Sequence, residues 1–220
     1  MVNLTRIYTR TGDDGSTALG DFSRTRKTDP RLQAYADANE ANAAIGVAIT
    51  AGGLSQEVCR VLTRVQNDLF DVGADLCTPL AETYAFPRCG SRREWVDELE
   101  ADCDTFLEPL EKLRSFILPS GTPGSAYLHL ALTIVRRAER STWAAIEAYG
   151  TTPGAGDGAG GVNPATARYL NRLSDLLFIL ARTANKDAGG DVLWQPGGGR
   201  AQAPTTRRRS AASAEEHEVD

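Results

Sequence analysis

Apolar residues recur at intervals of three and four positions from Pro30 to Asp187, and this spacing constrains the fold more than any other feature of the chain. Such spacing gathers apolar side chains on one face of a helix, and the strict alternation that is typical of half-buried strands is scarce. The pattern predicts an all-α bundle of five helices, near residues 31–51, 55–78, 91–113, 122–149 and 163–187.

Residues at the predicted helix ends support these boundaries. Ser55 and Ser91 are candidate N-caps, Gly150 follows the end of a helix, and Pro164 stands where the first turn of a helix tolerates proline. In the fifth segment, the leucines form one apolar stripe at positions 170, 173, 177 and 180. The stripe predicts a helix face that is buried in the bundle.

The length of 220 residues suits one folded domain, which we expect over residues 1–200. Within it, the stretch 151–161 reads T-T-P-G-A-G-D-G-A-G-G. Chain so rich in glycine buries little surface, so we expect a flexible connector without a catalytic part. Residues 201–220 are polar and poor in apolar side chains, which predicts a disordered tail.

Composition excludes several classes of protein. A formal net charge of −5 argues against a general binder of nucleic acid or of membrane surfaces. The apolar runs are too short for a membrane span and the first residues do not resemble a signal peptide, so we expect a cytoplasmic protein. The cysteines lack C-x-x-C spacing and histidine is scarce, so no protein metal site is predicted.

The loop from Thr9 to Thr17, T-R-T-G-D-D-G-S-T, is a candidate phosphate-binding segment. Gly12 and Gly15 can adopt positive φ and turn backbone N–H groups toward one anion, and the threonines and the serine add hydroxyl groups. An ordinary turn is the competing interpretation, because Asp-Gly favours turns. The loop is not a Walker A motif, because no Gly-Lys-Ser/Thr follows at the required spacing.

The segment I-V-R-R-A-E-R carries a second candidate group. Helical spacing puts Arg136, Glu139 and Arg140 on one face and displaces Arg137 around the helix. Two guanidinium groups on one side match phosphate oxygens well, with Glu139 able to hold them in place. The competing interpretation is a solvated face with local ion pairs.

Two further residues are candidates with ordinary alternatives. Asn171 is able to hydrogen-bond a base or a ribose, although a plain surface asparagine is the commoner case. Phe116 lies in F-I-L-P-S-G just before the fourth predicted helix, and most such phenylalanines belong to the core.

These motifs together resemble the PduO-type ATP:cob(I)alamin adenosyltransferases. The resemblance rests on T-R-T-G-D-D-G-S-T, K-T-D-P-R, F-I-L-P-S-G, R-R-A-E-R-S and Y-L-N-R-L-S-D-L-L-F, in this order, and spans about residues 4–197. It implies a homotrimer of five-helix bundles that binds ATP and corrinoid in the cleft between subunits. The implied reaction transfers the 5′-deoxyadenosyl group of ATP to cob(I)alamin and releases triphosphate.

The resemblance also implies a role for each candidate residue. Arg136, Phe116 and Glu139 would be catalytic, with the Phe116 ring packing under the corrin to displace the lower axial ligand. Magnesium would bridge the phosphates. The ATP-binding residues would be Thr9, Arg10, Thr11, Gly12, Asp13, Gly15, Ser16, Thr17, Lys27, Arg136, Arg137, Glu139, Arg140 and Asn171. An adenosylcobalamin-dependent mutase and a flavoprotein reductase would be the partner proteins.

The chain departs from the family at two positions that usually hold a charged pair across the subunit interface. Asn39 stands where aspartate is usual and Leu132 where arginine is usual; Ser120, in place of a glycine, is a milder change. Loss of both charges together is compatible with a folded trimer. The alternative to an active enzyme is therefore a relative that binds ATP or cobalamin as a carrier or sensor. An unrelated helical interaction protein is a third hypothesis.

Overall fold

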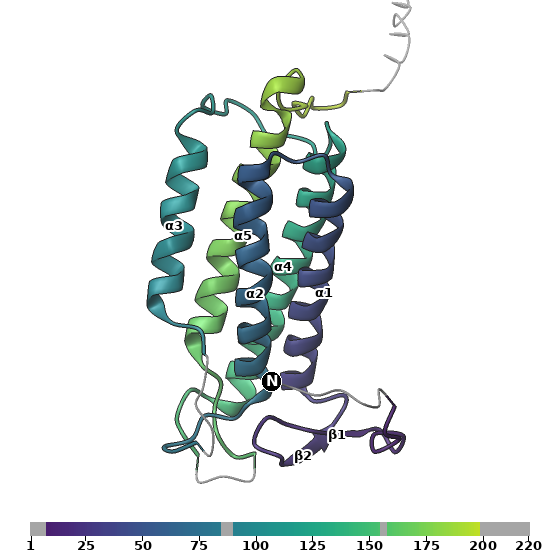
Figure 1. The fold of residues 1–220 in the computed structure, drawn as a ribbon, viewed down its shortest axis with the longest axis vertical. Coiled ribbons are helices and arrows are strands. Elements are labelled where there is room, and N and C mark those ends of the chain that lie inside the picture. The colour runs from purple at the N-terminus through teal and green to yellow at the C-terminus, as the bar shows by residue number, and fades with distance from the viewer. Residues whose placement is uncertain (1–7, 85–89, 155–157, 199–220) are drawn as a thin grey trace, which may run out of the picture.

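A computed structural model describes residues 8–84, 90–154 and 158–198, and it confirms the five-helix bundle (Figure 1). The tail predicted over 201–220 lies outside the described residues. A short antiparallel hairpin, which the sequence did not predict, pairs Ser16 with Arg26. The elements are β1 Ser16–Ala18, β2 Arg24–Arg26, α1 Pro30–Ala51, α2 Gln56–Cys77, α3 Arg93–Leu107, α4 Pro123–Tyr149 and α5 Pro164–Asn185, followed by a 3₁₀ turn at Lys186–Ala188.

Polar caps begin most of the helices. The hydroxyl group of Ser55 accepts a hydrogen bond from Val58 N at 3.3 Å, as predicted for the start of α2. Thr122 caps α4 and Asn163 caps α5 in the same way, and proline occupies the first turn of α1, α4 and α5. These caps satisfy N–H groups that have no partner inside the helix.

The predicted limits of the third helix were wrong at both ends. Ser91 is not an N-cap, because it is buried and its backbone N–H donates to the Asp75 carboxylate at 2.7 Å. The helix begins two residues later and ends at Leu107 instead of residue 113. Pro109 has no N–H group with which to continue the helical hydrogen bonds.

The core lies between α1, α2, α4 and α5, with α3 packed on α5. The four leucines of the predicted stripe, Leu170, Leu173, Leu177 and Leu180, are fully buried. On α1 four of the five buried apolar residues are alanines, whose small side chains let α4 approach closely. No helix of the described residues is long and apolar enough to cross a membrane.

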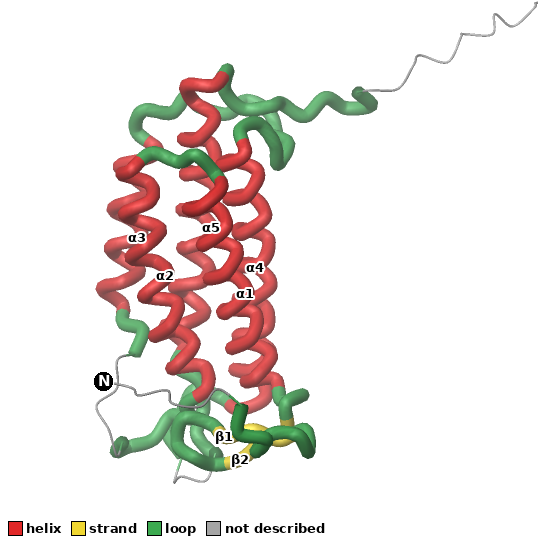
Figure 2. Tube along the Cα trace, turned by 45° about the vertical axis from the view of Figure 1, so that its right-hand side comes forward, coloured by secondary structure: helices red, strands yellow, loops and turns green. Residues whose placement is uncertain are grey.

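The two ends of the bundle carry different structures. The hairpin lies at the lower end in Figure 1, and the α3–α4 loop and the segment after α5 lie at the upper end, where Figure 2 shows them as green loops. At the upper end, Ile117 and Leu193 form an antiparallel bridge. The segment that carries Leu193 is joined to α5 by an ion pair between Arg182 and Asp191, at 2.8 Å.

The glycine-rich connector is joined to the lower end of the bundle. Gly154 N donates to Leu80 O at 2.8 Å, and Leu80 N donates to Gly161 O at 2.9 Å. The side chain of Arg31, at the start of α1, donates to the carbonyl groups of Gly160 and Gly161. Composition predicted a flexible segment. The hydrogen bonds of Gly154, Gly160 and Gly161 to other segments could be seen only in the tertiary structure.

Candidate functional site

The loop Thr9–Thr17 is mostly exposed, and its last two residues begin β1. Arg10 and Gly15 adopt positive φ values of 61° and 80°. Hydrogen bonds within the loop use several of its donors: Gly15 N donates to Gly12 O at 3.2 Å, and Ser16 N donates to the Asp14 carboxylate at 2.9 Å. In this conformation the loop is a series of turns, and the hydroxyl groups of Thr9 and Thr11 hydrogen-bond to each other at 2.9 Å.

Two cations border this loop. The backbone N–H of Lys27 donates to Gly15 O at 2.9 Å, and a Cβ atom placed on Gly12 would lie 3.1 Å from Lys27 Nζ. Arg24 of β2 donates to Thr11 O at 2.9 Å and also contacts the Ser16 hydroxyl group. The structure therefore brings Lys27 to the predicted phosphate loop. It adds Arg24, which sequence reasoning missed because the hairpin was not predicted.

Asp14 opposes these cations inside the loop. Hydrogen bonds from the hydroxyl group and the backbone N–H of Ser16 lower the pKa of this exposed carboxyl. The ionised carboxylate fixes the turn, and it leaves Ser16 with its hydroxyl proton already donated. An arriving anion would have to attract Arg24, which lies 3.9 Å from the Asp14 carboxylate, more strongly than Asp14 does.

The arginines of α4 separate onto two sides of the helix. Arg136 and Arg140 are exposed, and Arg140 Nη1 donates to Arg136 O at 3.2 Å. Arg137 instead faces α1, where its guanidinium pairs with Glu40 and lies 3.3 Å from the buried Asp37 carboxylate. The hydrogen bond to Glu40 raises the pKa of Arg137. Two of the three arginines are thus available to a ligand, and the third links α4 to α1.

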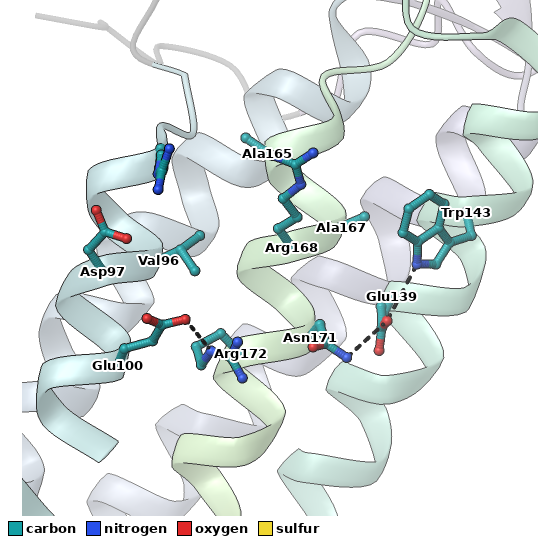
Figure 3. Close-up of a pocket in the computed structure, with 11 residues that line it drawn as sticks. Val96, Asp97, Glu100, Glu139, Trp143, Ala165, Ala167, Arg168, Asn171 and Arg172 are labelled. Carbon is teal, nitrogen blue, oxygen red and sulfur yellow. Dashed lines mark hydrogen bonds and ion pairs between the residues drawn. The ribbon is translucent and has the colours of Figure 1, made fainter. Parts of the chain in front are cut away.

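A cavity of about 630 Å³ opens beside this face, between α3, α4 and α5. Figure 3 shows Glu139 of α4 between Asn171 of α5 and Trp143, one turn further along α4. Glu139 Oε1 accepts from Asn171 Nδ2 at 3.3 Å and from Trp143 Nε1 at 3.4 Å. The structure thus brings together two predicted residues and adds Trp143, which its i+4 spacing from Glu139 could have indicated.

Arginines line the α3–α5 side of the same cavity. Arg172 donates to Glu100 at 3.0 Å and to Asp175 at 2.7 Å. Arg93 of α3 and Arg168 of α5 also line this cavity. The cavity therefore combines an amide, a carboxylate and an indole on one side with three arginines and the carboxylates of Asp97 and Glu100 on the other, a set suited to a polar ligand.

Phe116 is not a core residue, because 78% of it is exposed. Its ring meets Trp194 edge to face, with centroids 6.0 Å apart. With Phe178 of α5, these rings line an apolar cavity of about 660 Å³ at the upper end of the bundle. An exposed aromatic surface of this kind is suited to a large apolar ligand.

His129 lies behind the apolar cavity, with its ring edge to face on Phe178 at 6.0 Å. Among the described residues, its buried Nε2 atom has no hydrogen-bond partner. Burial lowers the pKa of His129, so the imidazole is neutral at pH 7.

The candidate groups occupy three levels along α4. The phosphate loop lies at the lower end, where the Tyr149 hydroxyl group at the end of α4 reaches Asp29. Arg136 lies thirteen residues before Tyr149, which corresponds to roughly 20 Å of helix. Phe116 lies near the opposite end of the helix, in the α3–α4 loop. One chain therefore does not bring its own phosphate loop to its own Arg136.

The two positions that depart from the resembled family have different surroundings. Leu132 is buried on α4, with 5% exposed, whereas Asn39 on α1 is exposed. The neighbouring carboxylates already have partners: Asp37 and Glu40 pair with Arg137, and Asp175 pairs with Arg172.

Comparisons with known proteins agree with one another. A family model described as cobalamin adenosyltransferase matches residues 7–184. The chain is 55% identical over 199 residues to a corrinoid adenosyltransferase of Mycobacterium tuberculosis, covering 90% of this chain and 97% of the relative. It is 41% identical over 193 residues to a cobalamin adenosyltransferase of Cupriavidus metallidurans, covering 87% and 95%.

Solved structures give the same result. The fold is similar to that of a variant PduO-type ATP:corrinoid adenosyltransferase from Lactobacillus reuteri, complexed with cobalamin and ATP. The TM-score is 0.74 at 30% identity, and the match covers 87% of this chain and 100% of the other.

Proposed function

The chain belongs to the cobalamin adenosyltransferase family and is an ATP:corrinoid adenosyltransferase, and we propose that its phosphate loop, its α4 arginines and Phe116 are the parts that carry out the reaction. The reaction transfers the 5′-deoxyadenosyl group of ATP to cob(I)alamin and gives adenosylcobalamin and triphosphate. The single observation that carries the assignment of residues is the order of the two cavities along the bundle, in which the polar cavity lined by Glu139 lies below the apolar cavity at Phe116.

In this proposal the triphosphate binds to cations. Lys27 and Arg24 meet it from the phosphate loop, whose threonines, glycines and Asp13 surround it, and Arg136 and Arg140 meet it from α4. Guanidinium and ammonium groups stabilise the charge that grows on the leaving triphosphate as its bond to the 5′-carbon breaks. Asn171 and Glu139 orient the nucleoside.

Arg137 faces α1 and contributes to the site indirectly. Its pairing with Asp37 and Glu40 leaves it little freedom to reach a phosphate, so we assign it to holding α4 against α1. Rigid placement matters because the cobalt must approach the 5′-carbon in line with the leaving oxygen.

Magnesium ions commonly accompany ATP, and the residues here fit only a shared site. Among the described residues no group of three His, Cys, Asp or Glu side chains could hold a metal ion. A Mg²⁺ ion would take most of its ligands from the phosphates, with Asp13 and Asp14 as the carboxylates at the loop. Bound there, it would neutralise phosphate charge.

Phe116 serves the corrinoid in this proposal. An exposed phenyl ring beside Trp194 and Phe178 provides an apolar surface that excludes water and competing ligands from the lower face of the corrin. Cobalt without a lower ligand is more easily reduced to the cob(I) nucleophile, so the wedge favours the reactive state.

The complete site needs a second copy of the chain. Because Tyr149, which contacts Asp29 beside the hairpin, lies roughly 20 Å from Arg136 along α4, we propose that the loop of one subunit closes over the α4 face of the next in a homotrimer. A cytoplasmic location and delivery of the product to a mutase, with electrons from a flavoprotein reductase, remain predictions from the family resemblance.

The test is a spectrophotometric assay of the full chain with chemically reduced cob(I)alamin and Mg·ATP. We expect loss of cob(I)alamin absorbance and formation of light-sensitive adenosylcobalamin. Arg136→Ala should reduce turnover by at least about a hundredfold, as loss of a donor to developing charge does in other enzymes. The matched control is Arg60→Ala, at an exposed arginine on α2. Undiminished activity of the Arg136 variant would contradict the proposed triphosphate contact.

A second function is favoured by one observation, the absence of charge at Asn39 and Leu132. A carrier or sensor would bind ATP or cobalamin and form no product. Isothermal titration of the wild-type protein with each ligand, together with a null result in the assay above, would support that function and exclude the enzyme.

A further inference from the structure

Arg31 is the most deeply buried basic residue of the chain's described part, with 1% exposed. In that part of the molecule no carboxylate forms an ion pair with it. Its guanidinium instead donates to backbone carbonyl groups: to Gly160 at 2.7 Å, and to Gly161 and Leu76 at 3.4 Å each. Burying a charge with only neutral partners is unfavourable, so this arrangement needs a reason beyond packing.

The partners of Arg31 show what it joins. Leu76 belongs to the last turn of α2, whereas Gly160 and Gly161 end the glycine-rich connector. The connector packs closely there, because a Cβ atom on Gly160 would lie 1.8 Å from Leu80 O. One guanidinium group therefore joins the start of α1, the end of α2 and the end of the connector, close to the hairpin.

Tyr149 extends the contact toward the phosphate loop. Its ring lies under the guanidinium of Arg31, with the centroid 4.6 Å from Cζ, which is a cation–π geometry. Its hydroxyl group donates to Asp29 at 2.6 Å. Asp29 also accepts from the Thr25 hydroxyl group of β2 at 2.5 Å and caps α1.

Lys27 lies between these two bonded residues. Thr25 precedes it and Asp29 follows it by two positions each, so fixing both residues fixes the backbone that carries Lys27. The same backbone donates to Gly15 O of the loop at 2.9 Å. The connector also reaches the hairpin directly, since Gly158 N donates to the Asp21 carboxylate at 3.1 Å.

We propose that Arg31, Tyr149, Asp29, Gly160 and Gly161, which we call the Arg31 anchor, hold the hairpin and Lys27 in the position that binds ATP. Arg31 is then a positioning residue for the nucleotide, and the connector is part of the site's support. This inference rests on the proposed role of the phosphate loop. It assigns nothing to the corrinoid, because Phe116 belongs to the α3–α4 loop, which lies at the other end of the bundle from the hairpin.

The test compares full-length variants in steady-state assays with reduced cob(I)alamin and Mg·ATP, alongside calorimetric titration with Mg·ATP alone. Arg31→Met keeps a long side chain and removes the charge. We expect its KM and Kd for ATP to rise by about tenfold, as a displaced binding group produces, with the KM for cob(I)alamin within about twofold of the wild type. Arg31→Lys, with fewer donors, should be intermediate.

Two further variants separate positioning from folding. Tyr149→Phe removes only the hydrogen bond to Asp29 and should give a smaller rise, about threefold, specific to ATP. Arg64→Met is the control, because Arg64 also joins helices through a partly buried contact, with Asp102, far from the hairpin. It should lower the melting temperature and leave the KM for ATP within about twofold.

The outcomes are distinguishable. If the wild type turns over but Arg31→Met and Tyr149→Phe keep wild-type KM and Kd for ATP, the anchor has no positioning role. If Arg31→Met is too unstable to purify, the Tyr149→Phe result decides. If the wild type shows no turnover, the proposed function fails, and titration with Mg·ATP still tests the anchor.

Discussion

Leu132 and Asn39 differ in burial, and burial limits which substitutions each position accepts. Leu132 faces the interior of the bundle with 5% exposed, and its neighbours on α4 at that depth are apolar. Asn39 lies on the surface of α1. An arginine in the same orientation at position 132 would therefore bury a charge among apolar neighbours.

Leu132→Arg alone should lower the free energy of unfolding by about 3 kcal/mol, because it buries a charge without a partner. Leu132→Met, which conserves volume, should lower it by less than about 1.5 kcal/mol. Urea denaturation measures both. If Leu132→Arg unfolds like the wild type, its side chain escapes to solvent.

If the missing pair limits catalysis, Asn39→Asp with Leu132→Arg should raise turnover.

Substitution of Phe116 should affect activity much more than stability. Because the ring is mostly exposed, Phe116→Ala should change the free energy of unfolding by no more than about 0.5 kcal/mol. Its turnover with cob(I)alamin should nevertheless fall by at least about tenfold, since the apolar wedge is lost. The control is Phe106→Ala, at a buried ring on α3, which should lose about 3 kcal/mol of stability. Normal turnover of the Phe116 variant would exclude it from the corrinoid site.

Among the elements, the start of α1 depends on the charge of Asp29. Burial acts to raise the pKa of this carboxyl, but hydrogen bonds from Thr25, Tyr149 and the backbone of Arg31 outweigh it and hold the pKa below its usual value. A lowered pKa contributes stability above the unfolded-state pKa of about 3.9, and that contribution is lost as the pH falls through the folded-state pKa.

Asp29→Asn keeps a cap oxygen and removes the charge, so it should cost about 1 kcal/mol at pH 7. The difference from the wild type should shrink as the pH falls below about 4. Urea unfolding at several pH values measures it, with Asp104→Asn, an exposed carboxylate on α3, as the control. A difference that stays constant with pH would mean that ionisation of Asp29 does not contribute.

At the scale of the whole molecule, a site shared between subunits predicts complementation. Lys27→Ala and Arg136→Ala should each be inactive alone. Co-expressed trimers would contain sites that combine an intact loop with an intact α4 face, and should recover about a quarter of wild-type activity. The trimer should have a mass of about 71 kDa, three times 23.6 kDa, by light scattering. Absence of recovery in mixed trimers would place the whole site within one subunit.

Local rules were sufficient for most of the fold. The leucine stripe of α5 and the cap at Ser55 follow from the chemistry of residues close in sequence, and both were predicted. The limits of α3 were not, because Ser91 is engaged by Asp75 from another helix. The hairpin escaped prediction because three-residue strands leave almost no periodic signal.

The sequence by itself determined the helical bundle, the family and the residue types at the site, because periodicity, caps and motifs depend on residues that are close together in the sequence. Only the tertiary structure decided where those residues lie. It exposed Phe116, turned Arg137 toward α1, separated the phosphate loop from Arg136 and tied the connector to Arg31. Each of these depends on contacts between segments far apart in the chain, which no local pattern encodes.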